Sequence, residues 1–521
     1  CHLITTMDKV LAMANATFQA VNPVTGQSFG DSINEMGKSE VESLISKAAA
    51  QKASLAKLSP KERAELLRAI AASVESKREK LIEVTMQETA LPNARLSGEL
   101  SRTVFQLEQF AKMVETGSHL QPVIDLPDAN WVPAARPDIR KANQPLGLVA
   151  VFAASNFPFA FSVIGGDSAS AIAAGCPIIV KAHPSHPNTC RIMRDAVVEG
   201  FKKVGLSEDC FVMAEGLNPE ITHWLAAHPD VTAIGFTGSG MVGKLLLDIS
   251  HKRAVPIPVY AEMGSLNPVF FTPGALKAGA DNLAKAALDS ATLGSGQFCT
   301  KPGIMVIPTG SEGDEFLKHV ESYLATLQVA PLLNKGIADR YSDAITKLAN
   351  SSKLKVYKGN ANSSGFGVEP TVFVVDWDVA KANHELLEEH FGPTSVIIRA
   401  DFNSFLDIAA SMEGQLCAAL HTVAGESVSQ LIDILGEKAG RVIMNGFPTA
   451  VAVTAAMQHG GQWPSSSTHT TSVGLDSIFR FMRPVAHQNF ADELLPKSLQ
   501  NGNPWKISRL INGVPSTEAI G

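Results

Sequence analysis

Strand-like and helix-like segments alternate along most of this chain, and that alternation limits the folds open to it. Short apolar runs such as Leu148–Ala153 and Pro177–Lys181 are typical of buried strands, and stretches with helical periodicity separate them. One series begins near Leu146, and a second begins after Asn267. Because alternating strands and helices favour parallel sheets with helices on both faces, the sequence predicts an α/β fold built from two such units.

The predicted elements of the two units can be given by residue range. Further elements expected in the first unit are strands over 210–213 and 231–236 and helices over 166–175, over 188–204 and from 241 onward. Those expected in the second unit are a helix over 275–293 and strands over 268–272, 303–307, 393–399, 415–421 and 441–445.

Before the first unit, the sequence predicts a hairpin and then helices. Asn-Pro-Val-Thr-Gly-Gln within 21–30 is typical of a hairpin turn. Each expected helix has its own start signal: a capping box of Ser39 and Glu42 for 39–57, Ser59-Pro60 for 61–80, and Pro92 for a helix to about Gly117.

Length and charge narrow the class of protein. With 521 residues, 45% of them hydrophobic and 18% charged, the chain can bury the cores of two or three domains. The net charge of −7 contains no block of like charges, so we expect neither nucleic acid nor a membrane surface as a partner. The apolar stretch 146–166 could mimic a membrane span, but Asn156 and Pro158 interrupt it, which favours a buried strand and loop. Small molecules are the expected ligands.

The cysteines indicate a reducing compartment. The six of them are scattered without CxxC spacing, which argues against a zinc site and against a disulfide framework. Residues 1–20 lack the pattern of a signal peptide, and Met7 or Met13 could be the natural start. We therefore expect a cytoplasmic protein.

One cysteine differs from the others in its surroundings. Cys299 lies in Gly-Ser-Gly-Gln-Phe-Cys-Thr-Lys-Pro-Gly, between glycines and polar residues that predict a sharp turn. A buried structural thiol is the plainer interpretation of such a residue. Upstream, however, the strand-like run 259–268 contains Glu262 followed by a glycine turn, and a nucleophilic thiol needs a base of this kind.

These two segments resemble a known pair of active-site motifs. Glu262-x-Gly followed by Asn-Pro, and then Gly-Gln-x-Cys299-Thr, is similar to the paired signatures of the aldehyde dehydrogenase superfamily. The resemblance extends from about Val21 to about Pro484. It implies a Rossmann-like dinucleotide-binding domain (8–120 and 146–262), an α/β catalytic domain (263–465) and an oligomerisation arm with a C-terminal extension (121–145 and 466–521). From 472 onward, a loosely ordered extension is the alternative. The family also implies a homodimer or homotetramer.

The resemblance assigns a role to three residues. It implies that Cys299 attacks an aldehyde, that the Asn156 amide and the backbone N–H of Cys299 stabilise the oxyanion, and that Glu262 activates water to hydrolyse the thioester. A pKa raised by burial would suit Glu262 for this task. No metal is expected.

Further motifs match the positions with which the family binds NAD or NADP. The matching residues are Thr237, Gly238, Ser239 and Gly243 in a strand–turn–helix junction, Lys181 at a strand end, and Glu389 and Phe391 in Glu-His-Phe-Gly-Pro. An ordinary surface lysine and a helix end closed by Gly-Pro are the alternatives for the last two motifs. Pro184 stands where NAD-preferring relatives often carry a glutamate, so NADP is not repelled. Ser185 and His183 are possible phosphate partners, and no arginine is evident nearby.

The substrate is the least determined feature. Several segments resemble a subgroup that contains 2-oxoglutarate semialdehyde (2,5-dioxopentanoate) dehydrogenases and an NADP-dependent fatty aldehyde dehydrogenase. We favour the 2-oxo acid semialdehyde, with Arg102 as carboxylate partner; Phe105, Phe159 and Phe161 could instead line a tunnel for a long aldehyde. His459 precedes a glycine pair at the expected substrate entrance, where it either packs or relays a proton. A cofactor-independent thiol esterase and a catalytically silent homologue are remote alternatives.

Overall fold

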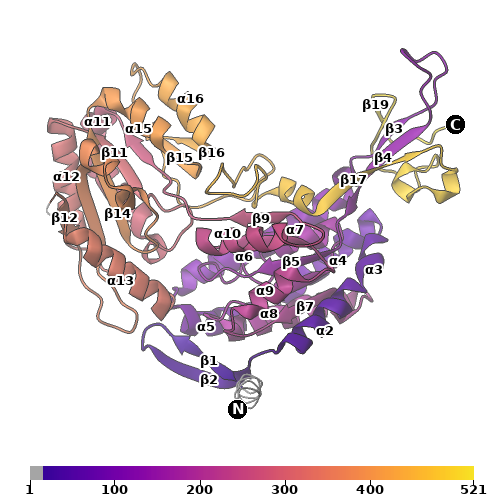
Figure 1. Cartoon of the computed structure of the whole chain (residues 1–521), viewed down its shortest axis with the longest axis horizontal. Coiled ribbons are helices and arrows are strands. Elements are labelled where there is room, and N and C mark those ends of the chain that lie inside the picture. Colours follow the sequence, from indigo (N-terminus) through magenta and orange to yellow (C-terminus); the bar gives the residue numbers. More distant parts are fainter. Residues whose placement is uncertain (1–15, 352) are drawn as a thin grey trace.

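The computed structural model describes residues 16–351 and 353–521, which form a short hairpin and three larger sheets (Figure 1). Two of the larger sheets are flanked by helices and lie in two lobes, and the third projects from one end. Each of the three draws its strands from one of the predicted domains. The division into domains itself stays a prediction.

The first lobe contains a five-stranded sheet in the order β7-β6-β5-β8-β9, and every neighbouring pair is parallel. Its strands are β5 (Leu148–Phe152), β6 (Ile178–Lys181), β7 (Phe211–Ala214), β8 (Val231–Thr237) and β9 (Val259–Glu262). Its helices are α7 (Gly166–Ala174), α8 (Pro187–Lys203), η2 (Glu208–Cys210), α9 (Glu220–Ala227) and α10 (Gly240–His251). The predicted alternation is confirmed here.

The chain before this sheet forms the hairpin and covers the lobe with helices. The elements are β1 (Thr17–Asn22), β2 (Gln27–Asn34), α2 (Lys38–Ala49), α3 (Lys52–Ala56), α4 (Pro60–Glu75), α5 (Arg78–Thr89) and α6 (Asn93–Glu115). The predicted hairpin is confirmed, and so are the helix starts at Ser59 and after Pro92.

Three predictions about these helices are wrong. The helix predicted over 39–57 is interrupted at Ala50 and Gln51, so that it forms α2 and α3. The capping box does not involve Ser39 and Glu42: the extended residue before α2 is Gly37, whose N–H donates to the Glu40 carboxylate (2.8 Å). The helix predicted over 61–80 ends at Glu75, where the Ser76 hydroxyl donates back to the Ser73 carbonyl (2.7 Å), and the next helix, α5, begins at Arg78.

The second lobe contains a seven-stranded sheet in the order β12-β13-β14-β11-β10-β15-β16, parallel except for the β12–β13 pair. Its strands are β10 (Val269–Phe271), β11 (Ile304–Pro308), β12 (Lys355–Lys358), β13 (Thr371–Asp376), β14 (Thr394–Ala400), β15 (Gln415–His421) and β16 (Ala439–Met444). Its helices are α11 (Pro273–Thr292), η3 (Leu293–Gly296), α12 (Ser311–Leu324), α13 (Lys335–Ala349), α14 (Trp377–Lys381), η4 (His384–Leu387), η5 (Phe402–Ser404), α15 (Phe405–Ser411) and α16 (Ser429–Lys438). The sequence analysis missed the elements between 311 and 381 and the helices α15 and α16.

The third sheet joins the middle of the chain to its C-terminal part, in the order β17-β4-β3-β18-β19. Its elements are β3 (Val123–Asp125), β4 (Ile139–Pro145), β17 (Met482–Gln488), β18 (Arg509–Ile511) and β19 (Val514–Ser516), with the short helices η1 (Ser118–Leu120), η6 (Leu475–Phe481), η7 (Asp492–Leu494) and η8 (Lys497–Leu499). A small core of Ile124, Ala142, Leu495 and Leu499 holds it together. The C-terminal segment is therefore not a loose extension, and its role in oligomerisation stays a prediction.

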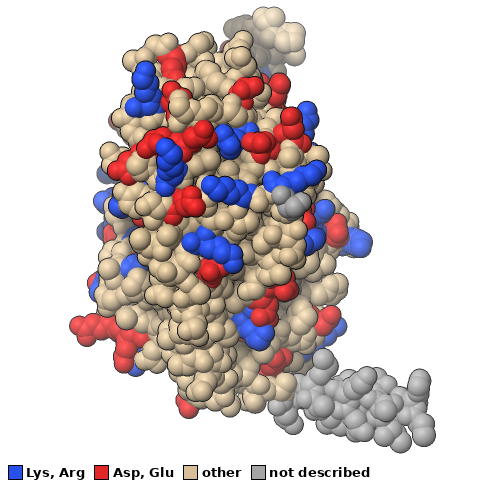
Figure 2. All heavy atoms as spheres, turned by 90° about the vertical axis from the view of Figure 1, so that its left-hand side faces the viewer, with Lys and Arg blue, Asp and Glu red and all other residues tan. Residues whose placement is uncertain are grey.

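The surface of the second lobe carries mixed charge. On the face seen in Figure 2, acidic and basic side chains are interspersed rather than gathered by sign. Among the helices of residues 16–351 and 353–521, none combines the length and apolar character that a membrane crossing requires. The apolar stretch 146–166 forms β5 and the loop that leads to α7, as expected.

A buried ion pair connects the C-terminal segment to the first lobe. Arg480 in η6 donates through Nη2 to Oδ1 of Asp167 on α7 (2.7 Å), and both side chains are buried. Burial raises the pKa of Asp167, and the charge and hydrogen bond of Arg480 oppose that rise. The pair keeps η6 against α7.

We predict that Arg480→Met destabilises the protein by about 3–5 kcal/mol, because it leaves a buried carboxylate without its partner. The control is Arg68→Met, which breaks a surface pair with Glu115 and should cost less than about 1 kcal/mol. Urea unfolding followed by fluorescence measures both. Equal transition midpoints for the two variants would contradict the assignment.

Candidate active site

A cavity of about 740 Å³ lies between the two helix-flanked sheets, and residues of both lobes line it. From the first lobe come the ends of β6, β8 and β9, and from the second come the cysteine loop, α13 and the segment around Phe391. In open α/β sheets, ligand sites lie outside the carboxyl ends of the strands. Cys299 and Glu262 both line this cavity.

The loop that carries Cys299 has an unusual backbone. Gly294, Ser295 and Gly296 have φ values of 56°, 58° and 68°, in the left-handed region. A Cβ on Gly296 would lie 2.1 Å from the carbonyl oxygen of Gly392, so only glycine fits there. Asn267 Nδ2 donates to the carbonyl oxygens of Cys299 (2.8 Å) and Lys301 (2.9 Å). These contacts fix the cysteine at the cavity wall.

Glu262, His459 and Cys299 form one buried group. Nε2 of His459 lies 2.9 Å from Oε1 of Glu262 and 3.7 Å from Sγ of Cys299. The Ser472 hydroxyl donates to the other carboxylate oxygen of Glu262. Because Nε2 is close to both groups, a proton on it lies between the carboxylate and the sulfur. The structure thus brings the predicted His459 to the nucleophile.

The environment shifts the pKa values of this group. Burial and the charge of Glu262 raise the pKa of Cys299 well above 9.0, so the resting thiol is protonated. Burial also acts to raise the pKa of Glu262, but the charge of His459 and the hydrogen bonds from His459 and Ser472 outweigh it and lower this pKa. The expected raised pKa of Glu262 is therefore wrong, because the sequence did not show these two partners.

Asn156 lies where β5 leads into a loop, at the edge of the cavity. Its Nδ2 donates to the carbonyl oxygen of Gln297, two residues before Cys299 (2.9 Å). An amide nitrogen carries two hydrogens, so a second donor remains for a substrate oxygen. Its role in binding the oxyanion stays a prediction.

The turn from β8 into α10 forms another part of the wall. Thr237, Gly238 and Ser239 line the cavity, and the Ser239 hydroxyl caps the helix by accepting from the Val242 N–H (3.4 Å). Gly243 plays a different part from the other three, since a Cβ there would lie 2.5 Å from Sδ of Met263. It lets α10 approach the chain after β9.

The strand end at Lys181 and the loop after it form the adjoining wall. Lys181 Nζ donates to the Gly216 carbonyl (3.1 Å), and burial lowers the pKa of this lysine to about 8. Pro184 lines the cavity, whereas the Ser185 hydroxyl accepts from Asn334 Nδ2 (2.9 Å). Burial holds the pKa of His183 well below 6.5, so a protonated His183 is disfavoured as a phosphate partner.

Glu389 and Phe391 also line the cavity, and their part in binding the cofactor stays a prediction. The space for the Glu389 carboxylate comes from Gly264, where a Cβ would lie 2.3 Å from Oε2 of Glu389. Both residues follow the short helix η4 and precede β14.

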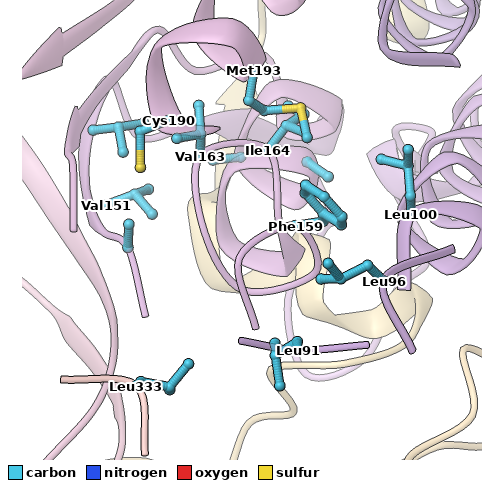
Figure 3. Close-up of a cluster of buried hydrophobic side chains, with 14 of the residues drawn as sticks. Leu91, Leu96, Leu100, Val151, Phe159, Val163, Ile164, Cys190, Met193 and Leu333 are labelled. Carbon is cyan, nitrogen blue, oxygen red and sulfur yellow. The ribbon is translucent and has the colours of Figure 1, made fainter. Parts of the chain in front are cut away.

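The predicted substrate residues separate into two groups. Arg102 on α6 lies over the ring of Phe161 (5.3 Å from Cζ to the centroid), and that ring lies 6.3 Å from His459. Its Nη1 is buried without a hydrogen-bond partner among the described residues. Phe159 is different: its side chain is fully buried among Leu96 and Leu100 of α6 (Figure 3). The assignment of Phe159 to a substrate channel is therefore wrong, because its side chain packs in the hydrophobic core and does not line the cavity.

Sequence reasoning missed several residues of the site. Asn334, which caps α13, and Arg340 of α13 line the cavity, although no arginine was evident near Pro184. Ser472 follows the glycine pair by more than ten residues, and no local motif marks it. Lys301 was visible as a charged residue directly after the nucleophile motif, which is the one signal that could have been used.

Solved structures with this fold include several dehydrogenases. The glyceraldehyde-3-phosphate dehydrogenase GapN from Methanocaldococcus jannaschii, complexed with NADP, superposes with a TM-score of 0.76 at 20% identity, covering 91% of this chain and 99% of that chain. A lactaldehyde dehydrogenase gives a TM-score of 0.79 at 20% identity, covering 91% and 96%. At this identity the likeness establishes the fold alone.

Sequence relatives are closer than these structures. The chain is 42% identical over 456 residues to alpha-ketoglutaric semialdehyde dehydrogenase 2 of Azospirillum brasilense, with 87% of each chain covered. It is 37% identical over 510 residues to the alpha-ketoglutaric semialdehyde dehydrogenase of Acinetobacter baylyi, with 96% of each covered. Residues 11–484 match the aldehyde dehydrogenase family, and the chain belongs to that family.

Proposed function

We propose that the chain oxidises 2-oxoglutarate semialdehyde to 2-oxoglutarate with NAD(P) as hydride acceptor. The observation that carries this proposal is the buried Cys299–His459–Glu262 group beside a cavity between two α/β lobes. The two relatives named above, whose substrate is the same compound under its older name, support the choice of aldehyde. A fatty aldehyde is not favoured.

The cavity residues fit a dinucleotide. A lysine, a helix N-terminus and a carboxylate line one continuous space, and these are the partners that ribose hydroxyls and a pyrophosphate need. Lys181 would hold the adenosine ribose, the turn at Ser239 the pyrophosphate, and Glu389 the nicotinamide ribose. When bound, NAD(P) accepts the hydride from the substrate carbon.

The nucleophile requires help, because its pKa is raised. As Sγ of Cys299 attacks the aldehyde carbon, Nε2 of His459, 3.7 Å away, takes the thiol proton while its own proton passes to Oε1 of Glu262. Glu262 releases that proton to water before hydrolysis begins. The Asn156 amide and the Cys299 backbone N–H are placed to stabilise the developing alkoxide. Loss of hydride then leaves a thioester on Cys299.

The second half of the reaction uses the same group as a base. Glu262, ionised at neutral pH, takes a proton from water as the water oxygen attacks the thioester carbon. The carbon–sulfur bond breaks, the carboxylate leaves, and the sulfur of Cys299 recovers a proton. His459 and Ser472 hold the carboxylate in place during both steps.

The proposed cofactor preference rests on the charges of residues that line the cavity. Pro184 supplies no carboxylate to repel a 2′-phosphate, and Lys181 and Arg340 provide positive charge on the cavity wall. We propose that the protein accepts both cofactors and favours NADP moderately.

The principal test removes the nucleophile. We predict that Cys299→Ala abolishes oxidation of 2-oxoglutarate semialdehyde but still binds NAD and NADP, because the thiol reacts with the aldehyde and does not hold the dinucleotide. Fluorescence titration gives both dissociation constants, and absorbance at 340 nm gives turnover. The wild-type protein should prefer the semialdehyde to long-chain aldehydes. Turnover in the variant, or failure of the wild type to bind either cofactor, would contradict the proposal.

The base is tested by its kinetics. We predict that Glu262→Gln slows thioester hydrolysis by about 100- to 10,000-fold but leaves a burst of NAD(P)H, because water loses its base while the thiol still reacts. The same change removes a negative charge beside Cys299, so the pKa of the thiol should fall. The pH dependence of iodoacetamide labelling measures that pKa, and a loss of burst and steady state together would refute the separation of steps.

His459 gives a matched comparison. In His459→Gln the pKa of Glu262 should rise, because the charge of His459 no longer opposes the effect of burial. Below that raised pKa the carboxyl group is protonated and cannot act as a base, so the acid limb of the steady-state rate should move to higher pH. An unmoved limb would mean that His459 only packs.

The substrate assignment is tested at Arg102. We predict that Arg102→Met lowers kcat/KM for 2-oxoglutarate semialdehyde by about 10- to 150-fold and hardly changes kcat/KM for pentanal. The loss corresponds to one charged hydrogen bond, which contributes about 1.5–3 kcal/mol. Pentanal has the same chain length without the oxo and carboxylate groups. Lys112→Met, on an exposed part of the same helix, is the control for a lost charge. Equal losses for both substrates would exclude a carboxylate contact.

A further inference from the structure

A buried lysine lies two residues after the nucleophile and is not used in the chemistry. Lys301 is only 2% exposed to solvent. Its Nζ donates to the backbone carbonyl oxygens of His390 (2.8 Å), Gly392 (3.2 Å) and Thr394 (2.7 Å). An ammonium has three N–H donors, so this contact set uses all of them.

These three acceptors belong to one segment, and that segment forms the cofactor wall. Glu389 and Phe391, which line the cavity, stand directly before and between the carbonyls that Lys301 holds. The backbones already touch at Gly296 and Gly392. Lys301 therefore fastens the 389–394 segment to the loop that carries Cys299.

The ammonium also acts on a carboxylate. Glu389 is the charged group whose field raises the pKa of Lys301, although burial dominates and lowers that pKa to about 8. Burial in turn raises the pKa of Glu389 to about 7, and the charge of Lys301 and a hydrogen bond from the Ser265 backbone oppose the rise. A buried ammonium costs several kcal/mol, which neutral side chains could have avoided.

Other groups face this pair and enter its titration. The pKa of His390 is lowered by burial and then by the charge of Lys301. The negative charge of Glu389 is one of several causes that raise the pKa of Cys299. The exposed Glu388 lies next to Glu389 in the chain and is one of the groups that act on His390.

We propose that Lys301 is a positioning residue for the cofactor: it fixes Glu389 and Phe391 relative to Cys299, and its positive charge favours the carboxylate form of Glu389, which can accept hydrogen bonds from ribose hydroxyls. This inference rests on the proposed function, since it concerns how the dinucleotide is held. It assigns no chemical step to Lys301.

Two variants separate the charge from the hydrogen bonds. Lys301→Gln keeps two N–H donors without the charge, and Lys301→Met removes both. The control is Lys285→Met, which removes an exposed lysine on α11. For each protein we would measure the dissociation constant of NADP between pH 6 and 9, kcat, and the rate at which iodoacetamide labels the peptide that contains Cys299.

The expected result is a selective loss of cofactor affinity. NADP affinity should fall at acid pH as Glu389 becomes protonated. In Lys301→Gln this fall should occur about one pH unit higher, because the pKa of Glu389 rises when the positive charge is removed. Lys301→Met should weaken NADP about tenfold or more and lower kcat. Labelling of Cys299 without cofactor should stay within about threefold of the wild type, and Lys285→Met should resemble the wild type.

A double variant tests the link to Glu389. In a Glu389→Gln background, adding Lys301→Gln should no longer move the pH at which NADP affinity falls. The proposal is overturned if Lys301→Gln leaves NADP affinity and its pH dependence unchanged, or if only Cys299 labelling changes. Failure of the wild-type protein to bind NADP would instead overturn the proposed function, so the two outcomes remain distinct.

Discussion

The carboxylate of Glu262 lies buried beside a thiol, and much of the site follows from the need to stabilise it there. Burial disfavours the charged form, yet His459 and Ser472 reverse that effect with hydrogen bonds to both carboxylate oxygens. Both residues come from the segment after β16, so this segment must pack on β9. Backbone hydrogen bonds from Met263 to Ser465 (2.8 Å) and from Ser467 to Ala261 (3.0 Å) hold it there.

The same principle governs the cysteine loop. A turn with successive left-handed residues leaves backbone groups without regular partners, and buried groups of this kind are costly. Asn267, itself left-handed at φ 45°, supplies an amide to the carbonyls of Cys299 and Lys301. Lys301 in turn donates hydrogen bonds to the carbonyls of His390 and Thr394, in the segment with which Glu389 and Phe391 line the cavity. Nucleophile and wall are thus positioned by one connected set of hydrogen bonds rather than by two independent loops.

Local motifs predicted the parts of the site that depend on local sequence. The strand alternation, Cys299 and Glu262 could be read from short segments, since each strand end and turn has its own signature. The contact between Glu262 and His459 spans 197 residues of sequence, and no periodicity shows which distant segment folds back. The pKa of Glu262 was predicted in the wrong direction because the sequence did not show that His459 lies beside it. Phe159 was misplaced because an irregular loop has no repeat that tells its inner face from its outer face.

Arg102 is the predicted carboxylate partner, and its surroundings favour a charged aldehyde over a long apolar one. Arg102 lies over Phe161 and carries a buried Nη1 without a partner among the described residues. Leaving such a donor unpaired costs about 1–3 kcal/mol, and a carboxylate recovers this energy whereas an alkyl chain cannot. Sites built around an unmet polar group discriminate more strongly than apolar pockets do, because the wrong ligand leaves the group desolvated. If Arg102 binds the carboxylate as predicted, the ring of Phe161 serves to orient the guanidinium rather than to line an apolar tunnel.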